Sequence, residues 1–115
     1  PDTTPAKGFD FRALSKMVGR ETAVDLVRAT LKDARDVLDK AQAQAPETGQ
    51  LAHRALGGAA VIGLEDLAAT LREIEYAAQA EDRDSLIELA EILDELLSTL
   101  GAEIEAIVQP EKTGS

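Results

Sequence analysis

The sequence predicts an all-α protein, an antiparallel up-down-up-down four-helix bundle with a short additional N-terminal helix. Apolar residues recur at intervals of three and four, the spacing that gives a helix one buried face. Aromatic residues are only 3% of the 115 residues, and no segment shows the apolar–polar alternation of a strand. Glycine and proline separate the helical segments by short turns, which favours antiparallel neighbours.

The first two helices are defined by their caps and by one long apolar seam. We expect a short helix over about 10–18, capped by Asp10 and ended by Gly19. A long helix is expected over about 20–44, and Pro46 prevents its continuation. Its seam, spaced like that of a bundle helix, is Val24, Val27, Leu31, Ala34, Leu38 and Ala41.

Three more helices follow, over about 48–62, 64–80 and 83–108. Gly63 separates the first two, and Asp82 is the expected N-cap of the last. The leucine-rich seam of 83–108 is also compatible with a coiled coil, but short turns favour a bundle within one chain. The expected buried positions are Leu51, Ala52, Ala55, Ala59, Ile62, Leu64, Leu67, Leu71, Ile74, Ala78, Leu86, Leu89, Leu93, Leu96, Leu100, Ile104 and Ile107.

The chain length suits one domain with a single core. We expect the bundle to occupy residues 9–108, after a flexible lead-in over 1–8 and before a tail or linker over 109–115. The chain begins with proline and ends in "PEKTGS", which suggests a module from a larger multidomain protein.

Charge and composition indicate which classes of partner are disfavoured and where in the cell the protein is expected. The net charge of −10 disfavours nucleic acid and anionic membranes, which recruit clustered Lys and Arg. There is no cysteine, hence no disulfide framework and no thiolate metal site. No apolar run approaches the roughly 18 residues of a membrane span, and no signal peptide is visible. A cytoplasmic domain is therefore expected.

The chain offers few groups for chemistry. No Gly-x-Ser-x-Gly elbow is present, and no glycine loop after a strand could hold a nucleotide phosphate. The single histidine, His53, has no second histidine or Glu-x-x-His partner with which to bind a metal. We therefore predict no metal and no cofactor of the protein's own.

His53 is the candidate nucleophile. The periodicity of its helix places it on the outer side, and a neutral imidazole carries a lone pair that can form a covalent intermediate. Gly57 lies one helical turn further on the same face, followed by Gly58. Two glycines in a helix interior cost roughly 2 kcal/mol relative to alanine. A reason to accept that cost is clearance: without a side chain at 57, a large partner can approach the ring.

The stretch "AHRALGGAAVIG" resembles the histidine-containing phosphotransfer (HPt) domain, whose signature is Ala-His-x-Leu-Lys-Gly, then small residues, then a hydrophobic residue and glycine. Matching positions are Ala52, His53, Gly57, Gly58, Ala59, Ile62 and Gly63, and "LEDLAATLREIE" resembles the family's next helix. The resemblance covers about residues 9–108. Ala55 and Leu56 depart from it, because the family has leucine and lysine there.

The resemblance implies a four-helix bundle that relays a phosphoryl group between aspartates of response-regulator receiver domains. His53 would be the phosphoryl acceptor, through Nε2, and the receiver would supply the magnesium ion. The module would be a stoichiometric carrier rather than an enzyme, with a hybrid histidine kinase as a further partner in cis or in trans. A kinase dimerisation helix pair is a related alternative, but it usually has an acidic residue where Arg54 follows the histidine.

Leu56 leaves the site without the lysine that would make a charge-assisted contact with phosphate. Counting residues from the turns places positions near 38 and 74 at the level of His53. The nearest cations at those levels are Arg35 and Arg72, which become candidate phosphate contacts. Gln50, one turn before His53, is a candidate for orienting the ring.

An apolar strip beside His53 is the expected receiver-docking surface. The residues assigned to it are Leu56, Ala60, Val61 and Leu64. The alternative function is a catalytically inert bundle in which the same strip binds a partner helix or drives dimerisation, and the absent lysine favours it.

Overall fold

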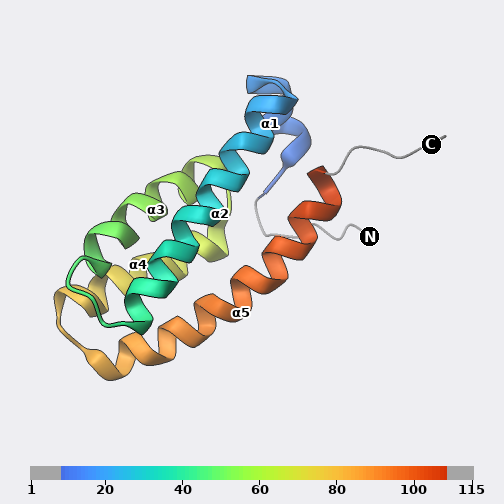
Figure 1. The fold of residues 1–115 in the computed structure, drawn as a ribbon. Helices are drawn as coiled ribbons and strands as arrows, with labels where there is room; N and C mark the ends of the chain where they lie inside the picture. The colour runs from blue at the N-terminus through green and yellow to red at the C-terminus, as the bar shows by residue number, and fades with distance from the viewer. Residues whose placement is uncertain (1–8, 109–115) are drawn as a thin grey trace.

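The computed structural model describes residues 9–108, which form five helices (Figure 1). They are α1 (Phe11–Val18), α2 (Arg20–Gln42), α3 (Thr48–Ile62), α4 (Glu65–Gln79) and α5 (Arg83–Val108). The predicted lead-in over 1–8 and tail over 109–115 lie outside the described residues.

The four longer helices form a closed ring of contacts. α2 packs on α3, α3 on α4 and α4 on α5, while contacts between α2 and α5 close the bundle. The short α1 packs on α2 at one end (Figure 1). The result is an elongated molecule of 52 × 25 × 23 Å. The predicted fold class, an all-α bundle with a short extra helix, is confirmed.

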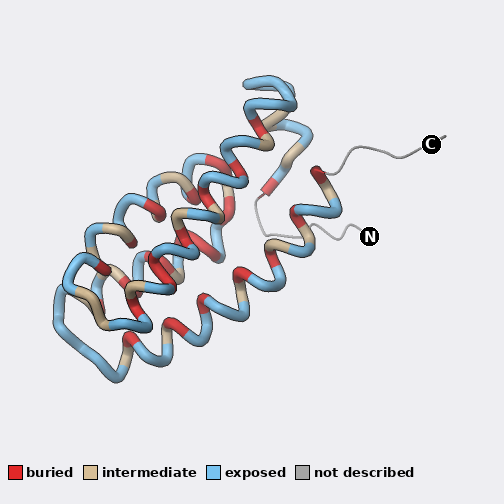
Figure 2. The backbone as a smooth tube through the Cα atoms, viewed as in Figure 1, coloured by how far each residue is buried: buried red, intermediate tan, exposed pale blue. Residues whose placement is uncertain are grey.

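Most of the predicted seam positions belong to the core, and buried positions line the inner sides of the helices (Figure 2). The predicted positions that are only partly buried against the core are Val24, Leu31, Leu51, Ala78, Leu89, Leu96 and Ile107. Burial of these apolar side chains is the main favourable term in folding. Most of the buried residues of α3 are small, unlike those of α4, where leucine and isoleucine predominate. The buried residues of α3 are Thr48, Ala52, Ala55, Ala59 and Ile62. Small side chains let α2 and α4 approach α3 closely, which brings groups on neighbouring helices within reach of its exposed face.

The turns between the long helices share one form of ending, in which a residue with positive φ follows the helix. The residues are Gln44 (φ 56°), Gly63 (φ 87°) and Glu81 (φ 55°). At each turn the next N–H reaches back to a carbonyl five residues earlier, as in a Schellman motif. These bonds are Ala45 N to Lys40 O, Leu64 N to Ala59 O and Asp82 N to Ala77 O, each 2.9 Å long. Because Gln44 already leaves the helical region, α2 ends at Gln42 rather than near 44.

The two predicted N-caps are present. Asp10 Oδ1 accepts a 3.0 Å hydrogen bond from Ala13 N at the start of α1. Asp82 Oδ1 accepts one of 3.1 Å from Ser85 N, and its Oδ2 accepts another of 2.7 Å from the Ser85 hydroxyl. Each cap satisfies backbone donors that the first helical turn leaves free. Gly19, with φ 91°, separates α1 from α2 as expected.

Arg20 ties the α1 end of the bundle to the end of α5. Its Nη2 donates a hydrogen bond to the carbonyl of Val108, the last residue of α5. Its guanidinium carbon lies 5.6 Å from the centroid of the Phe11 ring. Phe11 in turn stands beside the buried Phe9, with ring centroids 6.4 Å apart.

Candidate functional site

His53 projects from the outer face of α3. The helix buries Ala52 and Ala55 on its inner side, and this periodicity turns residue 53 outward. The side chain of His53 is 73% exposed. The imidazole is therefore open to a partner as large as another protein, as the periodicity of the sequence predicts.

Glu75 on α4 holds one nitrogen of the ring. Its Oε2 lies 2.9 Å from His53 Nδ1. The Glu75 side chain is only 14% exposed, and Gln79, one turn further along α4, donates a 3.4 Å hydrogen bond from Nε2 to the same oxygen. Because an ionised carboxylate can only accept, Nδ1 must carry the hydrogen of this bond. A neutral ring held in this way has its lone pair on Nε2.

The ring and its carboxylate border an open depression of about 440 Å³ between α3 and α4. Gln50 lines this depression too, but within residues 9–108 it forms no hydrogen bond to the ring. A Cβ added at Gly49 would lie 3.4 Å from the Ala78 Cβ, so the two helices nearly touch here. This close approach of small residues lets Glu75 reach across from α4.

The two adjacent glycines differ in their surroundings. A Cβ at Gly57 would meet nothing within 4 Å, so packing within the bundle does not require glycine there. A Cβ at Gly58 would lie 3.2 Å from Thr30 Oγ1 on α2, a closer contact than most side chains make. Gly58 therefore has a packing reason inside the bundle, whereas Gly57 has none.

The contact between Gly58 and Thr30 also shows which residues of α2 and α3 lie at the same level along the bundle axis. His53 lies five residues before Gly58, and Arg35 lies five residues after Thr30 on the antiparallel helix. Arg35 is thus at about the height of His53, while Arg72 lies about 4.5 Å along α4 from the Glu75 level. Both side chains are exposed, and neither forms an ion pair with another residue of the described part of the chain. The contact to the ring comes from an acid and not from either arginine.

The apolar strip assigned to docking is smaller than expected. Ala60 is exposed and Val61 is 82% exposed, whereas Leu56 is half-buried against the core. Leu64 is fully buried, so its assignment to the exposed strip was wrong. The reason is the turn after α3: a residue that follows the glycine of a Schellman motif commonly packs back against the helix it has left.

Sequence reasoning missed Glu75, although it came within one residue of it. The level count places position 74 opposite His53, and the polar residues within one position of it are Glu73 and Glu75. The contact between the helices shows that Glu75 is the one that faces the ring.

In the described range 9–108, no three His, Asp or Glu side chains gather closely enough to hold a metal ion. None of the five helices is long and apolar enough to cross a membrane. Comparison with models of known protein families, with curated proteins and with solved structures found no match to this chain. The class established is that of an all-α protein of five packed helices.

Proposed function

We propose that this domain is a histidine phosphotransfer module of the HPt type, which relays a phosphoryl group between receiver-domain aspartates. The observation that carries the proposal is the pairing of an exposed His53 with a nearly buried Glu75 at 2.9 Å. An exposed histidine alone is ordinary. A carboxylate that holds Nδ1 and leaves Nε2 free is an arrangement that suits a nucleophile.

The chemistry follows from the ring geometry. Nε2 attacks the phosphorus of an aspartyl phosphate on the receiver, an N–P bond forms, and the P–O bond to the aspartate breaks. The electron pair leaves with the aspartate carboxylate. The phosphorylated ring still carries the Nδ1 hydrogen and is positively charged, so the Glu75 carboxylate lies where charge develops. No proton has to leave during the transfer.

Positioning and charge neutralisation govern a phosphoryl transfer of this kind. Glu75 fixes the ring, and the receiver would bring the magnesium ion and its own acidic cluster. Arg35 and Arg72, which form no ion pair within residues 9–108, can turn toward the phosphate once it is bound, in place of the lysine that Leu56 replaces. In this proposal the domain binds no cofactor of its own, acts stoichiometrically in the cytoplasm and receives its phosphoryl group through a receiver or a hybrid kinase.

The surface around His53 supports docking of a receiver. α3 carries no carboxylate between Thr48 and Ile62, in a chain that has 22 acidic residues. On the C-terminal side of the ring the exposed residues of α3 are Gly57, Ala60 and Val61, none of which has a polar side chain. Like charges across an interface are costly, so an acidic receiver is better accommodated here than on the acidic α4–α5 side of the bundle.

The alternative is an inert interaction bundle, and one observation favours it. No cation contacts His53 within the described residues, and Leu56 stands where a lysine was expected. The two functions differ in what Glu75 does. In a relay it is a positioning residue whose loss slows transfer, whereas in an inert bundle its loss has no chemical effect.

The test uses receiver domains charged with acetyl phosphate and follows acid-labile label on this protein. Glu75→Ala is expected to slow transfer by about 10–100-fold, the usual effect of removing a group that orients a reactive side chain. Glu75→Gln, whose amide oxygen still accepts from Nδ1, recovers part of the rate. His53→Ala abolishes labelling.

The position of the phosphoryl group is a second readout. Treatment with phosphoramidate followed by NMR of the imidazole distinguishes the Nε2-phosphorylated ring from the Nδ1 isomer. The wild type should form the Nε2 isomer, and Glu75→Ala should give a mixture because both nitrogens become accessible. Labelling that persists in His53→Ala, or a failure of every receiver to transfer, would overturn the proposal.

A further inference from the structure

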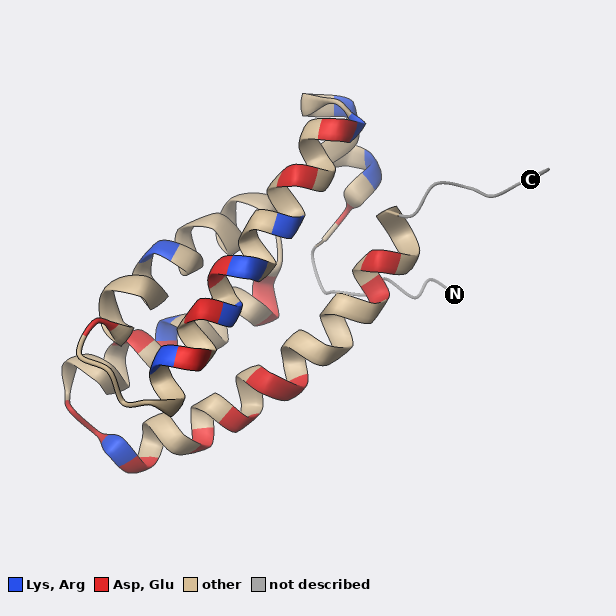
Figure 3. Cartoon of the chain, viewed as in Figure 1, with Lys and Arg blue, Asp and Glu red and all other residues tan. Residues whose placement is uncertain are grey.

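Charge is unevenly distributed between the two halves of the bundle. Between Phe9 and Ile62 the chain has seven acidic and eight basic residues. Between Glu65 and Val108 it has thirteen acidic and two basic residues. Figure 3 shows acidic positions recurring along α5, while both signs alternate along α2. The acidity of the protein is therefore a property of the α4–α5 side.

A furrow runs between α4 and α5 on this side. Two hollows, of about 460 and 350 Å³, lie along it. Leu89 lines one and Ile92 the other, one turn apart on α5, so the hollows lie end to end. The furrow is separate from the depression beside His53, which lies between α3 and α4.

The furrow has apolar side chains within an acidic border. Tyr76 from α4 and Ile92 from α5 are 61% and 51% exposed, although both are large and apolar. The described residues that line the two hollows include four carboxylates and no Lys or Arg. The carboxylates are Asp66, Glu73, Asp82 and Glu95. Apolar contact at the centre with charge around the edge is the usual composition of a protein-binding surface.

We propose that the α4–α5 furrow binds a basic amphipathic helix of a partner protein. A groove between two antiparallel helices accepts a third helix whose apolar face lies in the groove. The α4 helix of 15 residues is about 22 Å long, which matches four turns of such a helix. Lys or Arg residues flanking the apolar face would pair with the carboxylates at the border, and these pairs would favour basic partners over acidic ones.

The first test uses two isoleucines of α5 with nearly equal exposure. Ile92 lines the furrow and is 51% exposed, whereas Ile87 is 52% exposed and lies about 140° away around the helix. The probe is a labelled 18-residue synthetic peptide with leucines at helical spacing flanked by lysines, and anisotropy measures its affinity. Ile92→Ser should weaken binding about tenfold, as expected for a central apolar contact, and Ile87→Ser should change it little.

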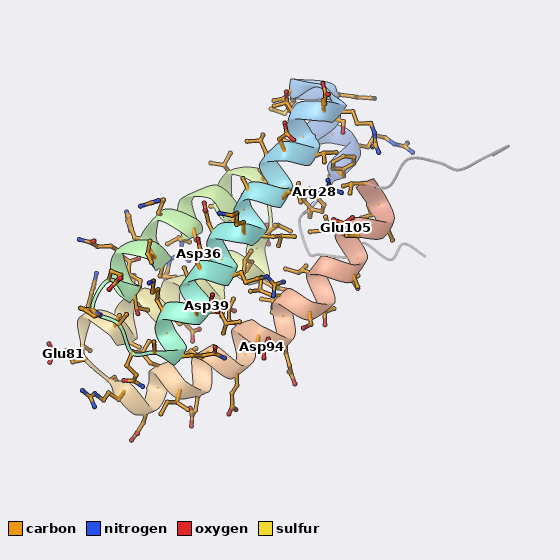
Figure 4. All side chains as sticks on the ribbon, viewed as in Figure 1. Arg28, Asp36, Asp39, Glu81, Asp94 and Glu105 are labelled. Carbon is orange, nitrogen blue, oxygen red and sulfur yellow. The ribbon has the colours of Figure 1, made fainter. Side chains whose placement is uncertain are left out.

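The second test separates the furrow from general acidity. Glu73→Gln with Glu95→Gln removes two charges at the border, and Asp36→Asn with Asp39→Asn removes two charges from α2 (Figure 4). Only the first pair should weaken peptide binding and reduce its dependence on salt. A peptide with glutamate in place of lysine should not bind, and a scrambled lysine–leucine peptide should bind far more weakly.

Specific outcomes would overturn the inference. Equal losses in the two isoleucine variants, or in the two charge variants, would mean that binding is not located in the furrow. If sedimentation showed that the wild type is a dimer and that Ile92→Ser is a monomer, the furrow would be the site of a second copy of this chain and not of a partner helix. His53→Ala should leave peptide binding unchanged, so this test succeeds or fails independently of phosphotransfer.

Discussion

Substitutions at Gly57 should raise the stability of α3 and reduce the access of a partner protein to His53. Glycine in a helix interior is less stable than alanine by about 1 kcal/mol. Because an added Cβ would meet nothing within 4 Å, no clash opposes this gain. Gly57→Ala should therefore raise the free energy of unfolding by about 1 kcal/mol, which for a bundle of this size raises the Tm by about 4 °C. Glutamine is also a good helix former, so Gly57→Gln should stabilise almost as much.

The same substitutions should affect phosphotransfer in the opposite direction. A glutamine at 57 places its side chain one turn from His53 on the face that a receiver would approach. Displacement of the reacting atoms by about 1 Å costs on the order of 100-fold in rate, so Gly57→Gln should slow transfer by 10–100-fold. Alanine, with a single added carbon, should have a smaller effect.

Gly101 supplies the matched control. It lies inside α5, and an added Cβ there would also meet nothing within 4 Å. Gly101→Ala and Gly101→Gln should raise the Tm by a similar amount without changing transfer. Circular dichroism gives the unfolding curves, and label from acetyl-phosphate-charged receivers gives the rates. If Gly57→Gln transferred the phosphoryl group at the wild-type rate, the clearance argument would be refuted. A lower Tm for Gly57→Ala would show that a side chain at residue 57 does meet a clash.

Two further predictions concern stability alone. Gly58→Ala should gain less than Gly57→Ala, because its Cβ would lie 3.2 Å from Thr30 Oγ1, and the full gain of about 1 kcal/mol should return in a Thr30→Ala background. Urea unfolding of the wild type, the two single variants and the double variant measures the coupling between residues 30 and 58. Purely additive changes in the free energy of unfolding would contradict the prediction. Hydrogen bonds from the Ser85 hydroxyl and backbone lower the pKa of Asp82 from its ordinary 3.8. The stabilisation by ionised Asp82 is therefore present above 3.8 and is lost as pH falls through the lowered value, so the advantage of wild type over Asp82→Asn should disappear in acid.

The sequence predicts the helices well because local signals and the apolar period agree. The predicted seam of α5 repeats every three or four residues from Leu86 to Ile107. Its buried positions are Leu86, Leu93, Leu100 and Ile104, and its partly buried positions, which pack against the core, are Leu89, Leu96 and Ile107. The glycine at 63 ends α3 as predicted, since φ of 87° favours glycine. The turns after α2 and α4 use Gln44 and Glu81 at positive φ, and neither residue type announces such a turn.

The site is less predictable, because it depends on contacts between helices. The periodicity of α3 suffices to expose His53, but it does not show which helix faces the ring. Glu75 reaches Nδ1 because Gly49 and Ala78 bring α3 and α4 close together, which is a tertiary fact. The same holds for the glycine pair: adjacent in sequence, they differ only in that Gly58 faces Thr30 and Gly57 faces open space.

The pattern of helix contacts also has a consequence for how the chain folds. Four of the five main helix pairs are consecutive in the chain, and only α2 with α5 joins distant segments. Folds dominated by contacts near in sequence form quickly, because little chain entropy is lost before each contact forms. Arg28 on α2 and Glu105 on α5 form a 3.1 Å ion pair across this one distant junction (Figure 4). Docking of α5 onto α2 is thus the step with the longest loop to close, and it should be the last to form and the first to open.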